Sequence, residues 1–144
     1  MCTEHRTMST SSATQPIAQS LGRGPFRDFL DGEGVALFDG AMGTMFYQRG
    51  VFVNRAFEEL NLTEPGLVKE VHAAYVEAGA DIIETNTFSA NRFRLQPFGL
   101  ADQVAEINKA AVEIARDASS GQAWDAGAMG PLGVRIEPFG KIAT

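Results

Sequence analysis

The segment 82–88, Ile-Ile-Glu-Thr-Asn-Thr-Phe, constrains the fold more than any other part of this chain, because it begins as a buried strand and ends in polar side chains. The segment 35–40, Val-Ala-Leu-Phe-Asp-Gly, is built in the same way, and 124–131 is a weaker third copy. Strands that collect polar residues at their carboxyl ends place a site on one edge of a parallel α/β sheet or barrel. The pattern therefore indicates an enzyme scaffold.

Two long helices connect the three expected strands. Segment 63–78 repeats apolar residues at three- and four-residue spacing, and we expect Thr63 to cap this helix and Gly79 to end it. Segment 101–118 has a similar apolar face and stops at Gly121. Strands joined by helical crossovers of this length are parallel. Short helices over 25–30 and 41–49 and an extended chain from 134 onward are also expected.

Length and composition limit the architecture. The 144 residues suit one domain, whereas a closed (β/α)₈ barrel needs roughly 250 residues. We therefore predict an α/β fold that forms the amino-terminal portion, about three βα units, of an incomplete (β/α)₈ TIM barrel, in a domain covering 25–144. Residues 1–24 are rich in Ser, Thr and Gln and poor in large apolar side chains, which predicts a disordered tail.

Charge and cysteine content bear on partners and location. The net charge of -6 argues against nucleic acid or an anionic membrane surface as the main partner. No apolar run approaches the roughly 20 residues of a membrane span. The single cysteine, Cys2, excludes an internal disulfide and fits a reducing compartment, so we expect a cytoplasmic protein.

The candidate site residues follow the first two strands. Asp39, Gly40 and Ala41 close the first strand, where small residues let the backbone approach a ligand, although a tight turn without a ligand is the plainer interpretation. Glu84 could be a general base, a partner for a ligand ammonium group or a buried structural acid. Asn86, at the end of the strand, is open to a binding or a structural interpretation.

Alternation along the second strand assigns its residues to two faces. Ile82, Glu84 and Asn86 fall on one face, and the intervening residues fall on the other. In a barrel one face points inward and the other meets the helices, so the polar groups on both faces need hydrogen-bond partners.

The remaining polar residues are weaker candidates. The segment 127–131, which includes Gly130 and Pro131, would bring a third small, backbone-exposing stretch to the same rim. His72 lies in the middle of a helix, and His5 and Cys2 lie in the tail. None of them has a second metal-binding residue at ligand spacing, so we expect structural histidines and an inert thiol.

Three segments, in order, resemble the homocysteine S-methyltransferase family. They are LFDGAMGTMFYQRG, EELNLTEPGLVKEVHAAYVEAGADIIETNTFSANRFRL and GAMGPLGVRIEPFGK, and they cover about 34–142. That family is a (β/α)₈ barrel, found alone and as the first module of cobalamin-dependent methionine synthase. GVFVNRAFEELNL, ANRFRLQPFGLAD and GPLGVRIEPFGK are most similar to the bacterial bifunctional homocysteine S-methyltransferase/methylenetetrahydrofolate reductases.

The resemblance implies a methyltransferase of methionine biosynthesis. In the family, a zinc ion held by three cysteine thiolates binds the sulfur of homocysteine as thiolate and directs it at an activated methyl group. The methyl donor stays open, since relatives use folate through cobalamin, S-methylmethionine, S-adenosylmethionine or betaine. Together with Glu84, taken from the strand pattern, the residues expected to contact homocysteine or border its pocket are Asp39, Gly40, Ala41, Glu84, Asn86, Thr87, Phe88, Gly130 and Pro131.

The chain departs from the family in its cysteines. The zinc ligands of the family lie in later strands, in a Cys-containing strand end and a Gly-Gly-Cys-Cys segment, and neither occurs in these 144 residues. We therefore expect no metal ligands and no catalytic residues here, and interpret the chain as part of a longer enzyme that needs the remainder of the barrel. Two alternatives stay open: a non-catalytic binding or interaction protein that keeps half of the site, and another TIM-barrel enzyme, such as a lyase using Glu84 as base.

Overall fold

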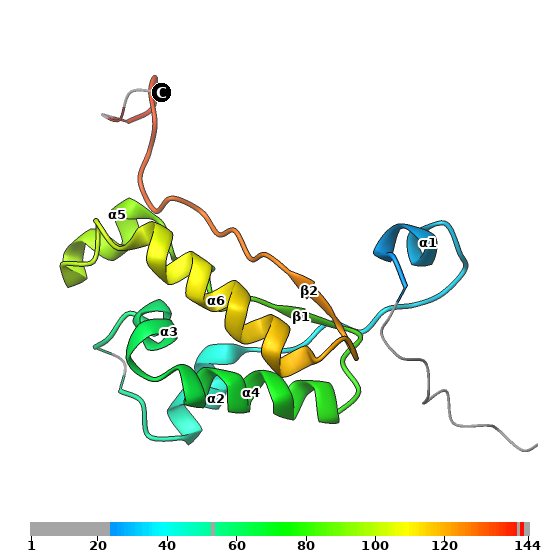
Figure 1. Cartoon of the computed structure of the whole chain (residues 1–144). Coiled ribbons are helices and arrows are strands. Elements are labelled where there is room, and N and C mark those ends of the chain that lie inside the picture. Colours follow the sequence, from blue (N-terminus) through cyan, green and yellow to red (C-terminus); the bar gives the residue numbers. More distant parts are fainter. Residues whose placement is uncertain (1–23, 53, 141, 143–144) are drawn as a thin grey trace, which may run out of the picture.

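The computed structural model describes residues 24–52, 54–140 and 142 (Figure 1). The tail expected over 1–24 lies outside these residues except for Gly24. In chain order the elements are α1 (Phe26–Leu30), α2 (Met42–Gln48), the 3-10 turn η1 (Phe57–Glu59), α3 (Leu60–Thr63), α4 (Pro65–Glu77), β1 (Ile82–Glu84), α5 (Arg92–Leu95), the 3-10 turn η2 (Gln96–Phe98), α6 (Val104–Ser119) and β2 (Trp124–Ala126).

The sheet is parallel, as the sequence predicts. β1 and β2 pair in parallel with Ile82 opposite Trp124 and Glu84 opposite Ala126, and α6 is the crossover between them. Helices α4 and α6 lie side by side and pack against β1 (Figure 1). The fold is therefore α/β, and both strands run toward the same edge of the sheet.

The first expected strand, over 35–38, is present only as one parallel bridge between Phe38 and Ile82. The Asp81 and Ile82 N–H groups both donate to the Leu37 carbonyl, at 2.8 and 3.1 Å, and Asp39 N–H donates to the Ile82 carbonyl at 2.9 Å. The expectation of a buried strand here is wrong in this structure, because Val35 and Leu37 remain 93% and 62% exposed. Only the carboxyl end of the segment is held against β1.

The helix termini differ from two expectations. Thr63 does not cap α4; its hydroxyl donates to the Glu59 carbonyl at 3.2 Å, and Glu64 occupies the cap position instead. Helix α6 starts at Val104, three residues later than expected, because Ala101 and the two residues after it form a turn. Gly79 ends the α4 turn with a φ of +97°, a conformation that glycine adopts without steric cost, as expected.

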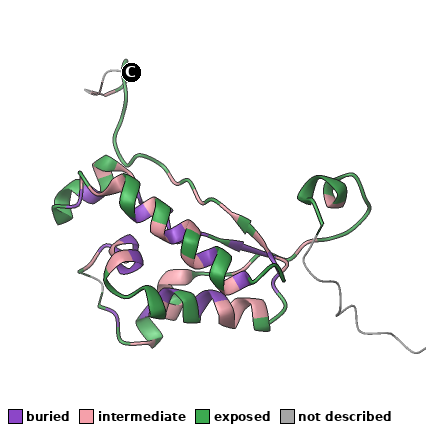
Figure 2. Ribbon diagram, viewed as in Figure 1, coloured by how far each residue is buried: buried purple, intermediate pink, exposed green. Residues whose placement is uncertain are grey.

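The core lies between the two long helices and β1. Ile83 is fully buried and packs with Ala80, Ala115 and Ala123, while a second cluster around Phe46 lies beneath α4. Figure 2 shows the buried residues on the facing sides of α4, α6 and β1. Burying one aliphatic side chain such as that of Ile83 stabilises the fold by about 1.5–3 kcal/mol. This packing fixes β1, and therefore the position of its polar carboxyl end.

His72 lies in this interior, where we expected a structural histidine. Its side chain is 0% exposed, and neither ring nitrogen has a hydrogen-bond partner among the described residues. Burial lowers the pKa of His72 to about 4, although the negative charge of Asp125 acts in the opposite direction. His72 is therefore neutral at pH 7.

Helix α1, the expected lead-in helix, covers the start of β2. The rings of Phe26 and Phe29 pack against Trp124 with centroid distances of 5.2 and 5.0 Å, and the indole N–H donates to the Gly24 carbonyl at 2.9 Å. The helices in the described part of the chain are too short or too polar to cross a membrane.

Candidate functional site

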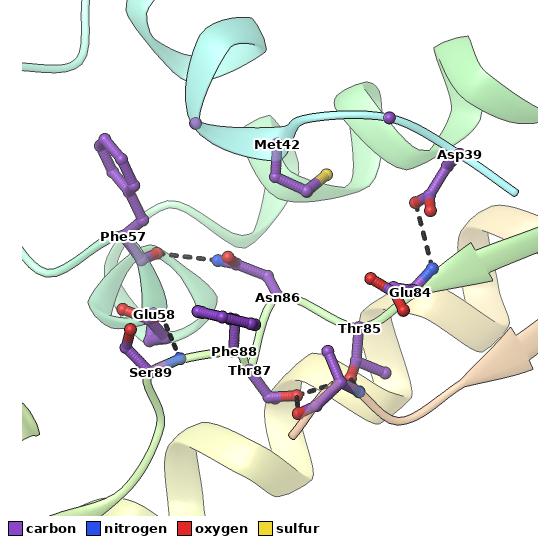
Figure 3. Close-up of a pocket in the computed structure, with 13 residues that line it drawn as sticks. Asp39, Met42, Phe57, Glu58, Glu84, Thr85, Asn86, Thr87, Phe88 and Ser89 are labelled. Carbon is purple, nitrogen blue, oxygen red and sulfur yellow. Dashed lines mark hydrogen bonds between the residues drawn. The ribbon is translucent and has the colours of Figure 1, made fainter. Parts of the chain in front are cut away.

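A cavity of about 300 Å³ opens where β1 and the segment 37–39 end (Figure 3). This volume is at the lower limit of typical small-molecule sites. Of the nine residues expected at a site, six line the cavity, whereas Ala41, Gly130 and Pro131 do not. The lining residues are Asp39, Gly40, Met42, Gly43, Phe57, Glu58, Glu84, Thr85, Asn86, Thr87, Phe88, Ser89 and Ala128.

Asp39 connects the two neighbouring strand ends. Its Oδ2 accepts the backbone N–H of Glu84 at 3.0 Å, drawn as a dashed line in Figure 3. Burial raises the pKa of Asp39 to about 6, the Glu84 N–H bond opposes that shift, and the charge of Glu84 adds to it. The carboxylate is therefore ionised at pH 7 and becomes protonated in mildly acidic solution.

Glu84 faces the cavity and is exposed. Side-chain alternation holds from Ile83, which packs in the core, to Glu84 on the opposite face. β1 ends at Glu84, so regular strand alternation does not extend to Asn86, yet both side chains line the cavity. Asn86 is only 6% exposed.

Asn86 is held by the segment that precedes α4. Its Nδ2 donates to the Phe57 carbonyl at 2.8 Å and to Asn61 Oδ1 at 3.0 Å, and Asn61 Nδ2 donates to the Asn86 carbonyl at 2.9 Å. Both hydrogens of the Asn86 amino group are thus used within the fold. Its side-chain carbonyl oxygen is the group left for a ligand.

Thr85 and Thr87 form a closed network with Ala128. Thr87 Oγ1 donates to the Ala128 carbonyl at 2.8 Å, and Ala128 N–H donates to Thr85 Oγ1 at 3.1 Å. The two hydroxyl oxygens lie 2.7 Å apart, and since Thr87 has already donated its proton to Ala128, Thr85 is the donor between them. The network fastens the end of β1 to the chain that follows β2.

Gly130 and Pro131 hold the Phe88 loop from outside the cavity. Gly130 N–H donates to the Phe88 carbonyl at 3.0 Å, and a β-carbon at position 130 would collide with that carbonyl oxygen. Asn91 Nδ2 donates to the Pro131 carbonyl at 3.5 Å. The Phe88 side chain, 58% exposed, forms part of the cavity wall.

Glu58 is the most informative lining residue that sequence reasoning missed. It is buried, and its Oε1 accepts the backbone N–H of Ser89 at 2.8 Å (Figure 3). One of two consecutive glutamates before a helix is ordinarily solvent-exposed, so the sequence carried no signal for this contact. The other lining residues beyond the nine expected are Met42, Gly43, Phe57, Thr85, Ser89 and Ala128.

The cavity is acidic. Asp39, Glu58 and Glu84 line it, and neither lysine nor arginine is among the lining residues that the structure describes. Clefts lined by one sign of charge attract ligands of the opposite sign. The geometry therefore suits a small ligand that carries a positively charged group.

The donor set does not fit a thiolate zinc centre. Within the described residues, no group of three His, Cys, Asp or Glu side chains could hold a metal ion. The cavity offers carboxylates, hydroxyls and the Met42 thioether, and the single cysteine, Cys2, lies outside the described residues. We therefore assign no zinc ligand in this part of the chain.

Comparisons with known proteins agree on one family. The homocysteine S-methyltransferase family profile matches residues 36–142. Methionine synthase from Mycobacterium leprae is 36% identical over 88 residues, which is 57% of this chain and 7% of that protein. Methionine synthase from Mycobacterium tuberculosis is 36% identical over 97 residues, which is 62% of this chain and 8% of that protein. The chain thus spans less than a tenth of these relatives.

A solved structure shares the fold. The homocysteine methyltransferase MmuM from Escherichia coli, in its metallated form, superposes with a TM-score of 0.66 at 30% identity. The superposition covers 76% of this chain and 42% of that one. Because the family profile matches residues 36–142, which is most of the chain, this chain belongs to the homocysteine S-methyltransferase family.

Proposed function

We propose that this chain binds homocysteine in the acidic cavity and contributes the amino-terminal part of the substrate site of a homocysteine S-methyltransferase built on a (β/α)₈ barrel. The observation that carries the proposal is the pair of carboxylates, Asp39 and Glu84, at neighbouring strand ends in a cavity whose described lining includes no lysine or arginine. Such strand ends are where barrel enzymes build their sites.

The carboxylates recognise the ammonium group of homocysteine. Asp39 is already fixed by the Glu84 N–H, so little side-chain freedom is lost when a ligand binds. Above pH 6 Asp39 is ionised and can accept a charge-assisted hydrogen bond from the ligand. Phe57, Phe88 and Met42 supply apolar surface for the methylene groups.

The sulfur chemistry needs groups other than those described. The family implies a zinc ion, which would supply Lewis-acid activation of the homocysteine sulfur. The described residues do not fit that ion, so we derive no step through it. This chain binds and orients the amino-acid end of homocysteine. We further propose a partial barrel domain over 25–144 and a cytoplasmic location.

Calorimetric titration of the full chain with homocysteine tests the proposal. Asp39→Asn should weaken binding about tenfold to a hundredfold, because a hydrogen bond to a charged group is lost. Glu70→Gln is the matched control, since Glu70, on α4, is an exposed carboxylate that forms a salt bridge with Arg49. Its affinity should equal that of the wild type.

The ligand can be varied in parallel. 4-Mercaptobutyrate is homocysteine without its amino group, so it should bind the wild type more weakly and should be insensitive to Asp39→Asn. Equal affinity of the wild type for the two ligands would rule out ammonium recognition by this cavity.

A further inference from the structure

Tyr75 on α4 contacts the turn that follows the first strand segment. Its hydroxyl donates to the Ala41 carbonyl at 3.3 Å, across 34 residues of sequence. The same carbonyl accepts the Met45 N–H at 3.5 Å, a long hydrogen bond at the start of α2. The Tyr75 hydroxyl therefore supplements a weak hydrogen bond at the start of that helix.

Gly40 lies directly against the Tyr75 side chain. A β-carbon at position 40 would lie 3.0 Å from the Tyr75 hydroxyl oxygen and 3.2 Å from its Cε1. Gly40 is absent from the described glycines with positive φ, so its backbone conformation does not require glycine. A β-carbon at this position would instead require the Tyr75 side chain to shift. Gly40 also lines the cavity, and its expected role beside a ligand stays a prediction.

The turn is thus held from two sides. On one side Asp39 Oδ2 accepts the Glu84 N–H at the end of β1, and on the other Tyr75 contacts Gly40 and Ala41. Tyr75 is itself fixed, because its ring packs against the core cluster around Phe46 and against the cluster around Ile83. A residue of the core therefore sets the position of a residue of the cavity.

We propose that Tyr75 is a positioning residue, which holds the Asp39–Gly40–Ala41 turn in the shape that presents the Asp39 carboxylate to the ammonium group of homocysteine. This inference rests on the proposed function. Tyr75 is outside the cavity lining, so it acts through the turn and not through contact with the ligand.

Tyr75→Phe tests the role while keeping the ring in the core. The chain offers a matched control in Tyr47→Phe, because Tyr47 packs its ring on Phe57 and is half exposed. Tyr75→Phe should raise the dissociation constant for homocysteine about threefold to tenfold, as expected for one neutral hydrogen bond. Tyr47→Phe should leave it unchanged, and both variants should keep the wild-type melting temperature within a few degrees.

A second readout needs no ligand. The ¹³Cγ resonance of Asp39 reports the titration of its carboxyl group. Two titratable groups interact with this carboxyl group, Glu84 on β1 and Tyr75 on α4, and the charge of Arg49 acts in turn on Tyr75. A loosened turn exposes the carboxyl group to water, so Tyr75→Phe should move the pKa of Asp39 down from about 6 toward its ordinary value. Tyr47→Phe should not move it.

A second variant reaches the same contact from the other side. Gly40→Ala introduces the β-carbon that pushes Tyr75 away, so it should change homocysteine affinity and the Asp39 titration in the same direction as Tyr75→Phe. Wild-type affinity and an unchanged Asp39 titration in Tyr75→Phe would overturn the assignment, as would equal changes in Tyr47→Phe. If the wild type binds no homocysteine, the proposed function fails, and the Asp39 titration alone decides the role of Tyr75.

Discussion

Asp39 and Asn86 are polar residues at the ends of neighbouring strand segments, and the structure treats them differently. The Asp39 carboxylate accepts one backbone N–H and lines the cavity with an elevated pKa. Asn86 lines the same cavity, yet both hydrogens of its amino group are bonded to Phe57 and Asn61. The comparison teaches that a strand-end position alone does not make a ligand-binding residue. Whether such a residue can bind a ligand depends on how many of its donors and acceptors are already hydrogen-bonded within the fold.

The largest expected effect is the loss of stability in Asn86→Ala. The substitution leaves the Phe57 carbonyl and Asn61 Oδ1 without this donor; the bond to Asn61 is buried and the bond to Phe57 is half-buried. Unsatisfied buried groups cost about 1–3 kcal/mol each, so the free energy of unfolding should fall by about 2–4 kcal/mol in chemical denaturation. Asn91→Ala, which removes the exposed cap of α5, should cost only about 1 kcal/mol. A wild-type melt combined with weakened homocysteine binding would make Asn86 a ligand residue instead.

Asp39→Asn should have the opposite effect on stability. Because the folded state raises the pKa of Asp39 from 3.8 to about 6, wild-type stability falls as pH rises between these values and stays lower above them. Asparagine can still accept the Glu84 N–H but carries no charge. After allowance for solvent screening, the variant should be more stable by about 1 kcal/mol at pH 7 and equal to the wild type below pH 4. Denaturation curves at both pH values check this, and a destabilised variant at pH 7 would show that Asp39 serves the fold.

His72 is a third case, because its buried side chain has no hydrogen-bond partner within the described part of the chain. His72→Leu keeps a similar volume and removes two unsatisfied nitrogens, so it should raise the free energy of unfolding by about 1 kcal/mol at pH 7. The folded state lowers the pKa of His72 from 6.5 to about 4, so the wild type should lose stability as pH falls through this window, and the variant should lose less. A loss of stability in His72→Leu at pH 7 would mean that the imidazole has a partner in solution, such as a bound water.

Much of the fold followed from local sequence. The apolar spacing of α4 and α6, the stop at Gly79 and the parallel order of the strands are confirmed. These features depend on the periodicity of neighbouring residues and on the conformational freedom of glycine, which one sequence displays directly. The same holds for the family motifs at the strand ends, which the family match over 36–142 confirms.

The finer points depended on contacts between distant residues. Nothing local in 35–38 tells whether its apolar side chains will be covered, and here Val35 and Leu37 are not. The partner of Asn86 is Asn61, 25 residues away, and the burial of Glu58 depends on Ser89, 31 residues away.

The sequence by itself therefore determined the family, the helices and the strand edge at which the polar groups collect. Tertiary structure alone decided which of those groups faces the cavity and which is consumed by the fold. The physical reason is that an N–H hydrogen already bonded within the fold is not available to a ligand. Its partner can lie far away in the sequence, so only the folded backbone brings the two together.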